Sequence, residues 1–488
     1  TVDMSEGEGR KTASGVLWSA IERFSVQAIQ LILSVIIARL VQPSDYGLIA
    51  MLSIFMAIAQ TFIDCGFSNA LIHKQQRTNI DYSTAFYFNV LIGVVVYAIL
   101  YVSSPFIASF YSEPRLELLT KVISLNLIIN SLSIVQITKL TVDMNFKLQA
   151  IISLAAVVVS GGVGVYLAYT GYGVWTLVVQ TLLNNMLNVV LLWCCVRWFP
   201  LLSFSLKSFK ELFNFGSKLL LSGLLETIYT NLYTLVIGKK FSADQVGFYN
   251  RAFVFSQLPS YNITFIINRV IYPLLCAQQE KPEILKQHYI HYLRLTCLLI
   301  FSLMIGLCCL ADPIINIVLT DRWSPAAVLL QLLCIAYMWY PVINFNYLVL
   351  NAVGRTDYVL KSEVLKKINS VAVLLLTIPL GIKAMCAGIA VSLLFNVFVG
   401  MFFTSKVISL SMREQWKELL PVLTISVSMG IFIYGVGLLI DNAYAKVAIE
   451  IPIAVLFVLA GLFIFKFRES IILVNYSKKI ICYVKSRR

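Results

Sequence analysis

Residues 15–72 read GVLWSAIERFSVQAIQLILSVIIARLVQPSDYGLIAMLSIFMAIAQTFIDCGFSNALI, two long apolar runs joined by the short turn VQPSDYG. Each run, residues 15–40 and 46–63, is long enough to cross a bilayer, for which ~20 apolar residues suffice. The first run carries polar residues at spacings of three and four, which line up along one helix face: Ser19, Arg23, Gln27, Gln30 and Ser34. A charged side chain inside a membrane is costly unless it faces a polar cavity or a partner. We therefore expect a helix that turns one wet face inward, away from lipid.

A similar pattern returns about 200 residues later. Residues 211–240 again place polar side chains at near-helical spacing: Lys218, Ser222, Glu226, Thr230 and Tyr233. The following stretch, IGKKFSADQVGFYN, aligns with IARLVQPSDYGLIA. The aligned pairs keep their order along the chain: Ile37 with Ile237, Arg39 with Lys239, Gly47 with Gly247, Gly173 with Gly381, and Asn188 with Asn396. Because internal duplication of membrane helices is a common transporter design, the alignment predicts two related halves.

The composition is typical of an integral membrane protein, with 59% of the 488 residues hydrophobic and only 13% charged. The formal charge of +14 does not indicate a nucleic-acid partner, because most Lys and Arg lie in short connections at helix ends, where cytoplasmic loops collect them. The ten cysteines form no CxxC pair and are expected to be reduced. The three histidines have no thiol or carboxylate cluster nearby, so neither a metal site nor a cofactor is expected.

Apolar run length predicts an all-α integral membrane protein with about fourteen transmembrane helices. After the first two runs, the expected spans are residues 82–107, 116–140, 148–169, 174–197, 212–238, 246–276, 284–310, 326–353, 358–380, 384–408, 419–440 and 447–467. We expect residues 1–200 to form an N-terminal six-helix lobe and residues 201–410 a C-terminal six-helix lobe. The two lobes should be parallel repeats, because each has an even number of spans. Residues 411–488 hold two additional transmembrane helices and a basic tail.

The distribution of positive charge predicts the orientation of the chain. One side of the predicted bundle holds roughly three times as many Lys and Arg as the other, which places both termini in the cytoplasm. The connection between the halves, residues 198–210, reads WFPLLSFSLKSFK and alternates aromatic, apolar and basic residues. We expect it to be an amphipathic linker on the cytoplasmic surface.

The sequence contains no P-loop, nucleophile motif, metal-ligand cluster or paired carboxylates, so no enzymatic activity is expected. Its polar residues lie instead within the spans, and the candidates for lining a cavity are Arg23, Gln27, Asn184, Asn188, Lys218, Asn250 and Arg251. Asn and Gln in spans also join helices by hydrogen bonds, and that alternative stays open. Glu22 and Glu226 are candidates for coupling to a proton or a sodium ion, although Glu22 and Arg23 can equally pair with each other.

The run ERFSVQAIQLILSVIIARLVQPSDYGLIAML, with TFIDCGFSNALIHKQQRTNIDYSTAFYFN after it, resembles the polysaccharide-exporter family. This is the branch of the multidrug/oligosaccharidyl-lipid/polysaccharide (MOP) exporter superfamily that includes O-antigen and colanic-acid flippases. Further matches are GYGVWTLVVQTLLN, SFKELFNFGSKLLLSGLLETIYTNLYTLVIGKKFS, GFYNRA and LTDRWSPAA, so the likeness covers nearly the whole chain except the last two spans. One departure follows residues 249–252, where FVF stands in place of the more polar residues of many relatives.

The resemblance implies two six-helix lobes around a central cavity in the bacterial inner membrane. It also implies alternating-access transport of a polyprenyl-pyrophosphate-linked oligosaccharide from the cytoplasmic to the periplasmic leaflet, alongside other polysaccharide-assembly proteins and membrane lipids. A lipid-linked anion needs a cationic wet cavity, and Arg23, Lys218 and Arg251 are the candidates to hold its pyrophosphate.

Three other functions stay open. A cation-coupled multidrug exporter of the same superfamily should favour aromatic and acidic cavity residues, whereas basic residues are at least as prominent here. A lipid-linked peptidoglycan-precursor flippase is a closer variant. A membrane polysaccharide polymerase or ligase commonly needs a sizeable external loop or domain, and the connections here are short.

Overall fold

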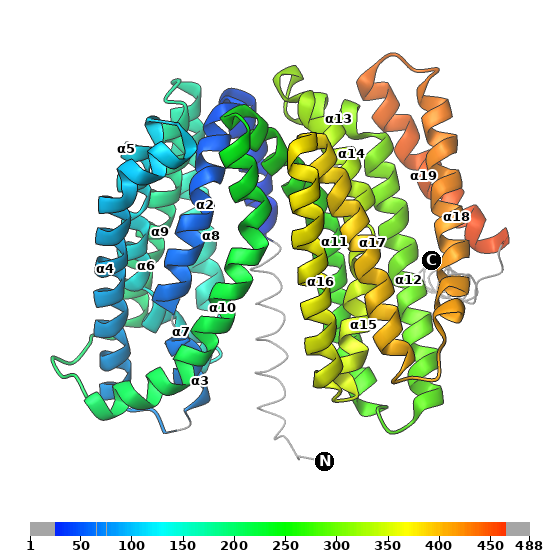
Figure 1. Ribbon diagram of the computed structural model, residues 1–488. Coiled ribbons are helices and arrows are strands. Elements are labelled where there is room, and N and C mark those ends of the chain that lie inside the picture. Colours follow the sequence, from blue (N-terminus) through cyan, green and yellow to red (C-terminus); the bar gives the residue numbers. More distant parts are fainter. Residues whose placement is uncertain (1–24, 65, 75, 465–488) are drawn as a thin grey trace, which may run out of the picture. The chain divides into compact units, whose positions relative to one another are not determined.

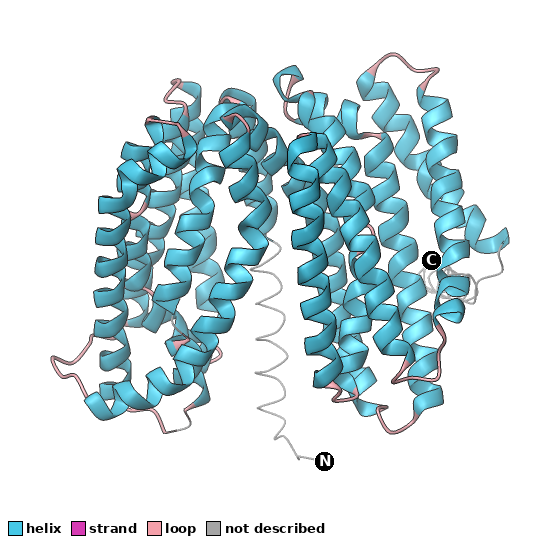
Figure 2. Cartoon of the chain, in the orientation of Figure 1, coloured by secondary structure: helices cyan, strands magenta, loops and turns pink. Residues whose placement is uncertain are grey.

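The computed structural model describes residues 25–64, 66–74 and 76–464, and their regular structure is helical throughout, as predicted (Figure 2). Within these residues, eleven helices or runs of helices are long and apolar enough to cross a membrane. Three further described helices are shorter or more polar: Ser25–Leu40, α11 (Ala243–Ala277) and α16 (Thr356–Thr377). They fall where the remaining predicted spans lie, so the structure is consistent with about fourteen spans. The described chain divides into two compact units, Thr1–Gly247 and Phe248–Arg488.

The first unit begins, in its described part, with the helix Ser25–Leu40. It continues with α2 (Pro43–Asp64), α3 (Phe67–His73), α4 (Asn79–Tyr111), α5 (Arg115–Ile123), α6 (Leu125–Ser131), α7 (Ile134–Val142), α8 (Phe146–Tyr169), α9 (Val174–Val196), α10 (Leu206–Lys240) and the start of α11 (Figure 1). The apolar run predicted as one span at residues 116–140 is divided into α5, α6 and α7. At the breaks, the hydroxyls of Ser124, Ser131 and Ser133 donate to carbonyl oxygens three residues earlier, at 3.2, 2.7 and 2.8 Å. Such bonds compete with the helical backbone pattern and bend helices.

The second unit contains the rest of α11, α12 (Pro282–Cys309), α13 (Ala311–Val318), η1 (Asp321–Trp323), α14 (Pro325–Tyr337), α15 (Tyr340–Ala352), α16, η2 (Ile378–Leu380), α17 (Ile382–Ser405), α18 (Met412–Gly437) and α19 (Ala443–Ile464). The run predicted as one span at residues 326–353 is split into α14 and α15, and Pro341 lies in the first turn of α15. Its missing N–H is tolerated there, because the first helical N–H groups have no intrahelical acceptor.

A buried polar cluster holds three helices of the second unit together. The hydroxyl of Tyr289 on α12 lies 3.2 Å from Asn346 Oδ1 on α15 and 3.2 Å from Gln415 Oε1 on α18. All three side chains are almost fully buried. Because each of these polar groups has a partner inside the unit, the cluster satisfies them at little cost and fixes the relative positions of the helices.

Two glycines paired by the sequence alignment meet at one crossing in the first unit, called here the glycine crossing. Gly47 and Gly247 are each the fifth residue of their helix, α2 and α11. Gly47 packs against Ala243, and Gly247 packs against Pro43. A Cβ at position 47 would lie 2.6 Å from the carbonyl carbon of Ala243, and a Cβ at position 247 would lie 2.9 Å from that of Pro43. The two helix starts therefore approach so closely that each needs glycine at this position.

The remaining aligned pairs also occupy corresponding places. Gly173 and Gly381 immediately precede α9 and α17, with positive φ angles of 54° and 95°. Asn188 and Asn396 are each the fifteenth residue of those helices. The positions paired by the alignment thus fall at the same points of corresponding helices, as an internal duplication requires.

The predicted amphipathic linker begins with an irregular segment, residues 197–205, that binds to the start of α4. The backbone N–H of Leu201 donates to Ser83 Oγ at 2.8 Å, and that of Ser205 donates to Thr84 Oγ1 at 3.1 Å. Trp198 is buried in the same cluster as Tyr82. The linker is therefore attached to the first unit by side chains of α4, and its helical part belongs to α10.

Candidate functional site

Seven of the nine predicted site residues lie among the described residues, whereas Glu22 and Arg23 lie outside them. The first unit contains five of the seven: Gln27 on the helix Ser25–Leu40, Asn184 and Asn188 on α9, and Lys218 and Glu226 on α10. The second unit contains Asn250 and Arg251, both on α11.

Four of the five polar residues predicted to share one face of α10 are exposed and recur every four residues: Lys218, Ser222, Glu226 and Thr230. The fifth, Tyr233, is half-buried. The neighbouring face packs on α2, where Thr61 Oγ1 and Thr227 Oγ1 lie 3.0 Å apart (Figure 1). A basic and an acidic side chain on the exposed face of a candidate span are expected to border a water-filled space rather than lipid.

The structure brings two predicted site residues of α9 into contact. Asn188 Nδ2 donates to Asn184 Oδ1 at 3.0 Å and to the backbone oxygen of Asn184 at 2.9 Å. Both side chains are half-buried, as is Gln27 on the first described helix. The pair satisfies part of its own hydrogen-bonding capacity and leaves the remaining amide groups for other partners.

A set of amides that the sequence reasoning did not single out joins α9, α6 and α2. Asn185 Nδ2 donates to Asn126 Oδ1 at 2.9 Å, and Asn130 Nδ2 donates to Gln60 Oε1 at 3.2 Å. Gln60 in turn donates from Nε2 to Asp64 Oδ1 at 3.0 Å. The first two of these hydrogen bonds join neighbouring helices, which is a common role of amide side chains inside membranes. The sequence does show these amides as polar residues within apolar runs. It could not show which residues they bond to, because the bonded residues lie 59 and 70 positions apart in the chain.

The two predicted residues of α11 differ in exposure. Asn250 is half-buried, whereas Arg251 is only 9% exposed. In this conformation the Arg251 side chain is therefore buried. An anion-binding role for Arg251 therefore needs a conformation that uncovers it.

Further along α11, polar and aromatic residues meet their counterparts on α15. The rings of Tyr261 and Tyr340 stack with centroids 4.0 Å apart, and Asn268 Nδ2 donates to Asn344 Oδ1 at 2.6 Å. Ser260 Oγ donates to the backbone oxygen of Tyr337 at 2.8 Å, which holds α11 against α14.

The second unit also contains buried charged groups that sequence reasoning missed. Glu450 on α19 is fully buried, and among the described residues neither of its carboxylate oxygens has a hydrogen-bond partner. Lys366 on α16 is 5% exposed and pairs with Glu363 at 3.0 Å, one helical turn earlier. Helix α16 carries five charged residues and α19 carries two, Lys446 and Glu450, and their spacing does not show which of them is buried.

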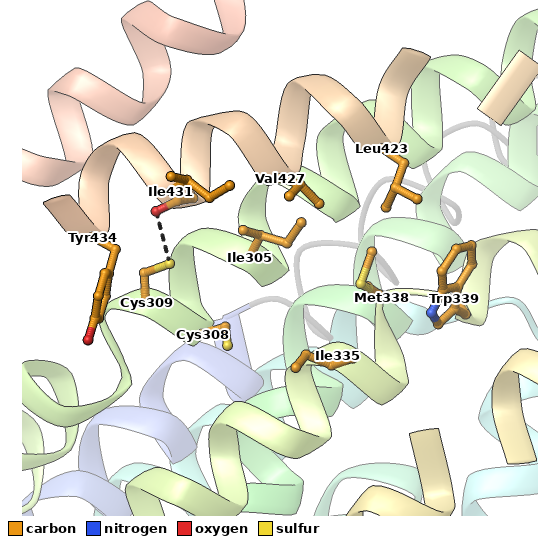
Figure 3. Close-up of a pocket in the computed structure, with 11 residues that line it drawn as sticks. Ile305, Cys308, Cys309, Ile335, Met338, Trp339, Leu423, Val427, Ile431 and Tyr434 are labelled. Atoms are coloured by element: carbon orange, nitrogen blue, oxygen red, sulfur yellow. Dashed lines mark hydrogen bonds between the residues drawn. The ribbon is translucent and has the colours of Figure 1, made fainter. Parts of the chain in front are cut away.

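An apolar groove of about 510 Å³ lies among α12, α14, α18 and the two residues that join α14 to α15. Figure 3 shows the side chains of Ile305, Ile335, Val427 and Ile431 lining it, with Cys309 Sγ donating to the backbone oxygen of Gly430 at 3.5 Å. Its aliphatic lining suits a hydrocarbon chain and offers little to a polar ligand.

Among the residues that the structure describes, no three His, Cys, Asp or Glu side chains are grouped to hold a metal ion. Apolar helices with polar faces and polar helix-joining bonds define a multi-pass membrane protein of the helical transporter type. The chain belongs to the family described as polysaccharide biosynthesis protein, whose sequence profile matches residues 36–328. This match confirms the resemblance noted from the sequence.

Named relatives match over most of their length. The chain is 25% identical to the teichuronic acid biosynthesis protein TuaB of Bacillus subtilis (strain 168) over 449 residues, which cover 91% of this chain and 93% of that protein. It is 25% identical to the lipopolysaccharide biosynthesis protein WzxC of Escherichia coli (strain K12) over 440 residues, 87% of this chain and 89% of that protein. Its fold is similar to that of the lipid II flippase MurJ in an inward closed conformation, with a TM-score of 0.75 at 15% identity, over 92% of this chain and 98% of that one.

Proposed function

We propose that this protein is a flippase that moves a polyprenyl-pyrophosphate-linked oligosaccharide from the cytoplasmic to the periplasmic leaflet by alternating access. The observation that carries the proposal is the exposed polar face of α10, with Lys218 and Glu226 set in a candidate membrane span. The names of TuaB and WzxC support polysaccharide assembly as the setting, and the MurJ-like fold supports movement of a lipid-linked molecule. The protein acts by transport and not by catalysis.

The pyrophosphate is held by Arg23, Lys218 and Arg251. Their cationic groups bind phosphate oxygens through charge-assisted hydrogen bonds, and the planar fork of arginine suits two oxygens at once. The oligosaccharide meets the other predicted polar residues: Gln27, Asn184, Asn188 and Asn250. The hydrocarbon tail stays in an apolar surrounding, because transferring it into water would expose a large apolar area.

Residues 1–200 and 201–410 act as the two lobes that open alternately, and residues 411–488 add two helices outside the repeat. The protein lies in the bacterial inner membrane with both termini in the cytoplasm, as the excess of Lys and Arg on one side favours. Glu22 and Glu226 couple transport to a proton or sodium gradient, and neighbouring polysaccharide-assembly proteins supply and remove the lipid-linked sugar.

The test is movement of lipid-linked oligosaccharide, extracted from the producing strain, in proteoliposomes. Arg23→Ala should abolish movement while the protein still inserts. Lys218→Gln should slow movement about tenfold, because one charge-assisted hydrogen bond is worth roughly 1.5–3 kcal/mol. Lys207→Gln is the matched control, since Lys207 is an exposed lysine in the first turn of the same helix; it should stay within about twofold of wild type.

Two outcomes would favour the rival functions. Wild-type protein that leaves the oligosaccharide in place and exports cationic dyes is a multidrug exporter. Wild-type protein that moves lipid-linked peptidoglycan precursor and ignores the extracted oligosaccharide belongs with the precursor flippases.

A further inference from the structure

Asp64 on α2 is an exposed carboxylate inside a candidate membrane span. The span runs from Pro43 to His73, because α3 continues the run after α2 ends, so Asp64 lies well before its end. The side chain points back along the helix, since Asp64 Oδ1 accepts a hydrogen bond at 3.0 Å from Nε2 of Gln60, one turn earlier. A charged side chain that is exposed within a span is costly in lipid, so Asp64 is expected to border water.

Gln60 is held in one orientation by α6. Asn130 Nδ2 donates to Gln60 Oε1 at 3.2 Å, so the NH2 group of the Gln60 amide is the end that faces Asp64. The bond from Gln60 uses one of about four lone-pair positions of the carboxylate. Because Asp64 is exposed, the carboxylate can accept further hydrogen bonds from a ligand. Asn130 and Gln60 therefore position Asp64 without enclosing it.

Helices α2 and α10 pack against each other in antiparallel directions (Figure 1). A Cβ at position 238 of α10 would lie 3.1 Å from Met51 Cγ, near the start of α2. Near the end of α2, Thr61 Oγ1 lies 3.0 Å from Thr227 Oγ1, and a Cβ at position 223 would lie 3.3 Å from Thr61 Cγ2. The contacts on α10 thus move to lower residue numbers as α2 advances.

The polar residues of the two helices lie on the same side of this contact. On α10, Ser222 comes one position before the contact residue Gly223, and on α2, Gln60 comes one position before the contact residue Thr61. One position is a turn of about 100° around a helix. Two packed helices face each other, and an antiparallel pair also runs in opposite directions, so the two reversals cancel and the same step leads to the same side. Asp64, one turn beyond Gln60, shares that side.

Asp64 lies level with the cationic end of the α10 face. Lys218 comes one turn before Ser222 on α10, and Asp64 comes one turn after Gln60 on α2. Because the helices are antiparallel, both steps lead toward the same end of the first unit. The stretch of α10 between Lys218 and Ser222 therefore stands beside Asp64, and all three of these side chains are exposed.

We propose that Asp64, oriented by Gln60, binds hydroxyl groups of the sugar next to the pyrophosphate of the transported molecule, an inference that rests on the proposed flippase function. A carboxylate accepts short, charge-assisted hydrogen bonds from O–H groups. The Ser222 hydroxyl beside it both donates and accepts. Lys218 and Ser222 are about 6 Å apart along the helix, comparable with the width of one sugar ring. A pyrophosphate held at Lys218 thus brings its first sugar to Asp64.

The charges on this side of the two helices favour a neutral sugar at Asp64 over the other candidate ligands. The carboxylate repels a pyrophosphate, which carries the same sign of charge. A cation that approached Asp64 would be repelled by Lys218 at the same level. Among the described residues, no three His, Cys, Asp or Glu side chains are grouped to hold a metal ion. A sugar hydroxyl is neutral and donates to the carboxylate, so neither charge opposes it.

The test compares two ligands on purified full-length protein in nanodiscs: the lipid-linked oligosaccharide extracted from the producing strain, and bare polyprenyl pyrophosphate. Asp64→Ala should weaken binding of the oligosaccharide about tenfold, because hydrogen bonds to a charged group are lost. It should not weaken binding of bare polyprenyl pyrophosphate, which has no sugar. Asp64→Asn keeps the shape of the side chain and the bond from Gln60, and it should likewise weaken the oligosaccharide alone.

Two further variants calibrate the comparison. Lys218→Gln should weaken both ligands to a similar extent, because both carry the pyrophosphate. Asp441→Ala is the matched control and should bind both ligands like wild type, since Asp441 is an exposed aspartate in the loop between α18 and α19.

The outcomes that would overturn the inference are distinguishable. If wild-type protein binds neither ligand, the flippase function itself fails. If wild-type protein prefers the oligosaccharide and Asp64→Ala keeps that preference, the function stands and the sugar site at Asp64 falls. If wild-type protein binds both ligands equally well, no sugar is read at Asp64. If both Asp64 variants weaken the two ligands alike, Asp64 serves the fold or the lipid pyrophosphate.

Discussion

The glycine crossing gives the sharpest test of the packing in the first unit. In Gly47→Ala, the new methyl carbon would lie 2.6 Å from the carbonyl carbon of Ala243, whereas ordinary contact begins near 3.4 Å. The obstacle is backbone, which cannot rotate away as a side chain can, so α2 and α11 must separate by about 1 Å. Overpacking of this kind costs about 1–3 kcal/mol. We expect a value at the upper end, near 3 kcal/mol, because no rotamer change relieves the clash.

The effect can be measured as the temperature at which half the detergent-solubilised protein is lost from the monodisperse peak after heating for a fixed time. This readout is kinetic, which suits a large membrane protein that unfolds irreversibly. Gly162→Ala is the matched control, because a Cβ at this position of α8 meets nothing within 4 Å. Replacing glycine by alanine in a helix interior is favourable by about 1 kcal/mol, so this control should be as stable as wild type or more stable.

Gly247→Ala should behave like Gly47→Ala, and the double variant should lose less than the two single losses added together. The two sites share one crossing: a Cβ at position 247 would lie 3.3 Å from the backbone nitrogen of Gly47. Once either methyl group has parted the helices, the second adds little, so the effects are not additive. A Gly47→Ala protein with wild-type heat resistance would refute the close approach described here. Fully additive losses would refute the shared crossing.

Other predictions concern stability in the same heating assay. Glu450→Met should raise heat resistance, because neither carboxylate oxygen has a hydrogen-bond partner among the described residues and an apolar side chain of similar length removes that cost, which we expect to exceed the attraction between Glu450 and Lys446; lower resistance would indicate that Lys446 compensates the buried carboxylate. Thr78→Ala should lower stability by about 1 kcal/mol, since Thr78 forms a capping box with Asp81 at the start of α4, and an unchanged value would refute the role of the cap. Glu363→Ala should destabilise more than Lys361→Ala, because it leaves the buried Lys366 without its ion-pair partner; equal effects would contradict that pairing.

The positions of the helices along the chain were predictable, because they follow from the length of each apolar run and from the spacing of the internal repeat. The helix before α2 ends at Leu40, and α10 ends at Lys240. These two ends are as far apart in the sequence as the aligned pair Gly47 and Gly247. Within the other spans, Pro341 predicts the kink that is found at the start of α15, but the breaks within residues 116–140 were not predicted. Those breaks depend on single serine hydroxyls that bond to their own helix. A hydropathy window averages over such residues and cannot register them.

The candidate site was predictable only in part, because the role of a polar residue depends on what faces it. Asn344 and Asn346 look alike in the sequence, yet the half-buried Asn344 bonds to Asn268 and the fully buried Asn346 bonds to Tyr289. Arg251 was chosen as an anion ligand because it is basic and within a span, but it is buried in this conformation. The common side of Lys218, Ser222, Glu226 and Thr230 was predictable because they share one helix, so spacing alone determines it. Their role in binding stays a prediction.

The same α10 face leads to a last prediction, on how binding and coupling are divided. Lys218 and Glu226 are eight residues apart, about 12 Å along the helix, which is too far for a direct ion pair. Under the proposed function, we expect this helix face to use Lys218 for the substrate and Glu226 for the coupling ion. We expect Lys218→Gln to weaken binding of the lipid-linked oligosaccharide while transport still responds to a proton or sodium gradient.

Glu226→Gln should do the reverse, because it removes a titratable carboxylate and keeps a side chain of nearly the same shape. Binding of the lipid-linked oligosaccharide in nanodiscs should stay within about twofold of wild type, while proteoliposome transport loses its dependence on the imposed gradient. If both variants lose binding to the same extent, the two charges serve one ligand. If Glu226→Gln transports with undiminished gradient dependence, the coupling group lies elsewhere. Separate effects would mean that one helix face holds the substrate anion at one level and the coupling ion two turns away, so that movement of α10 carries both together.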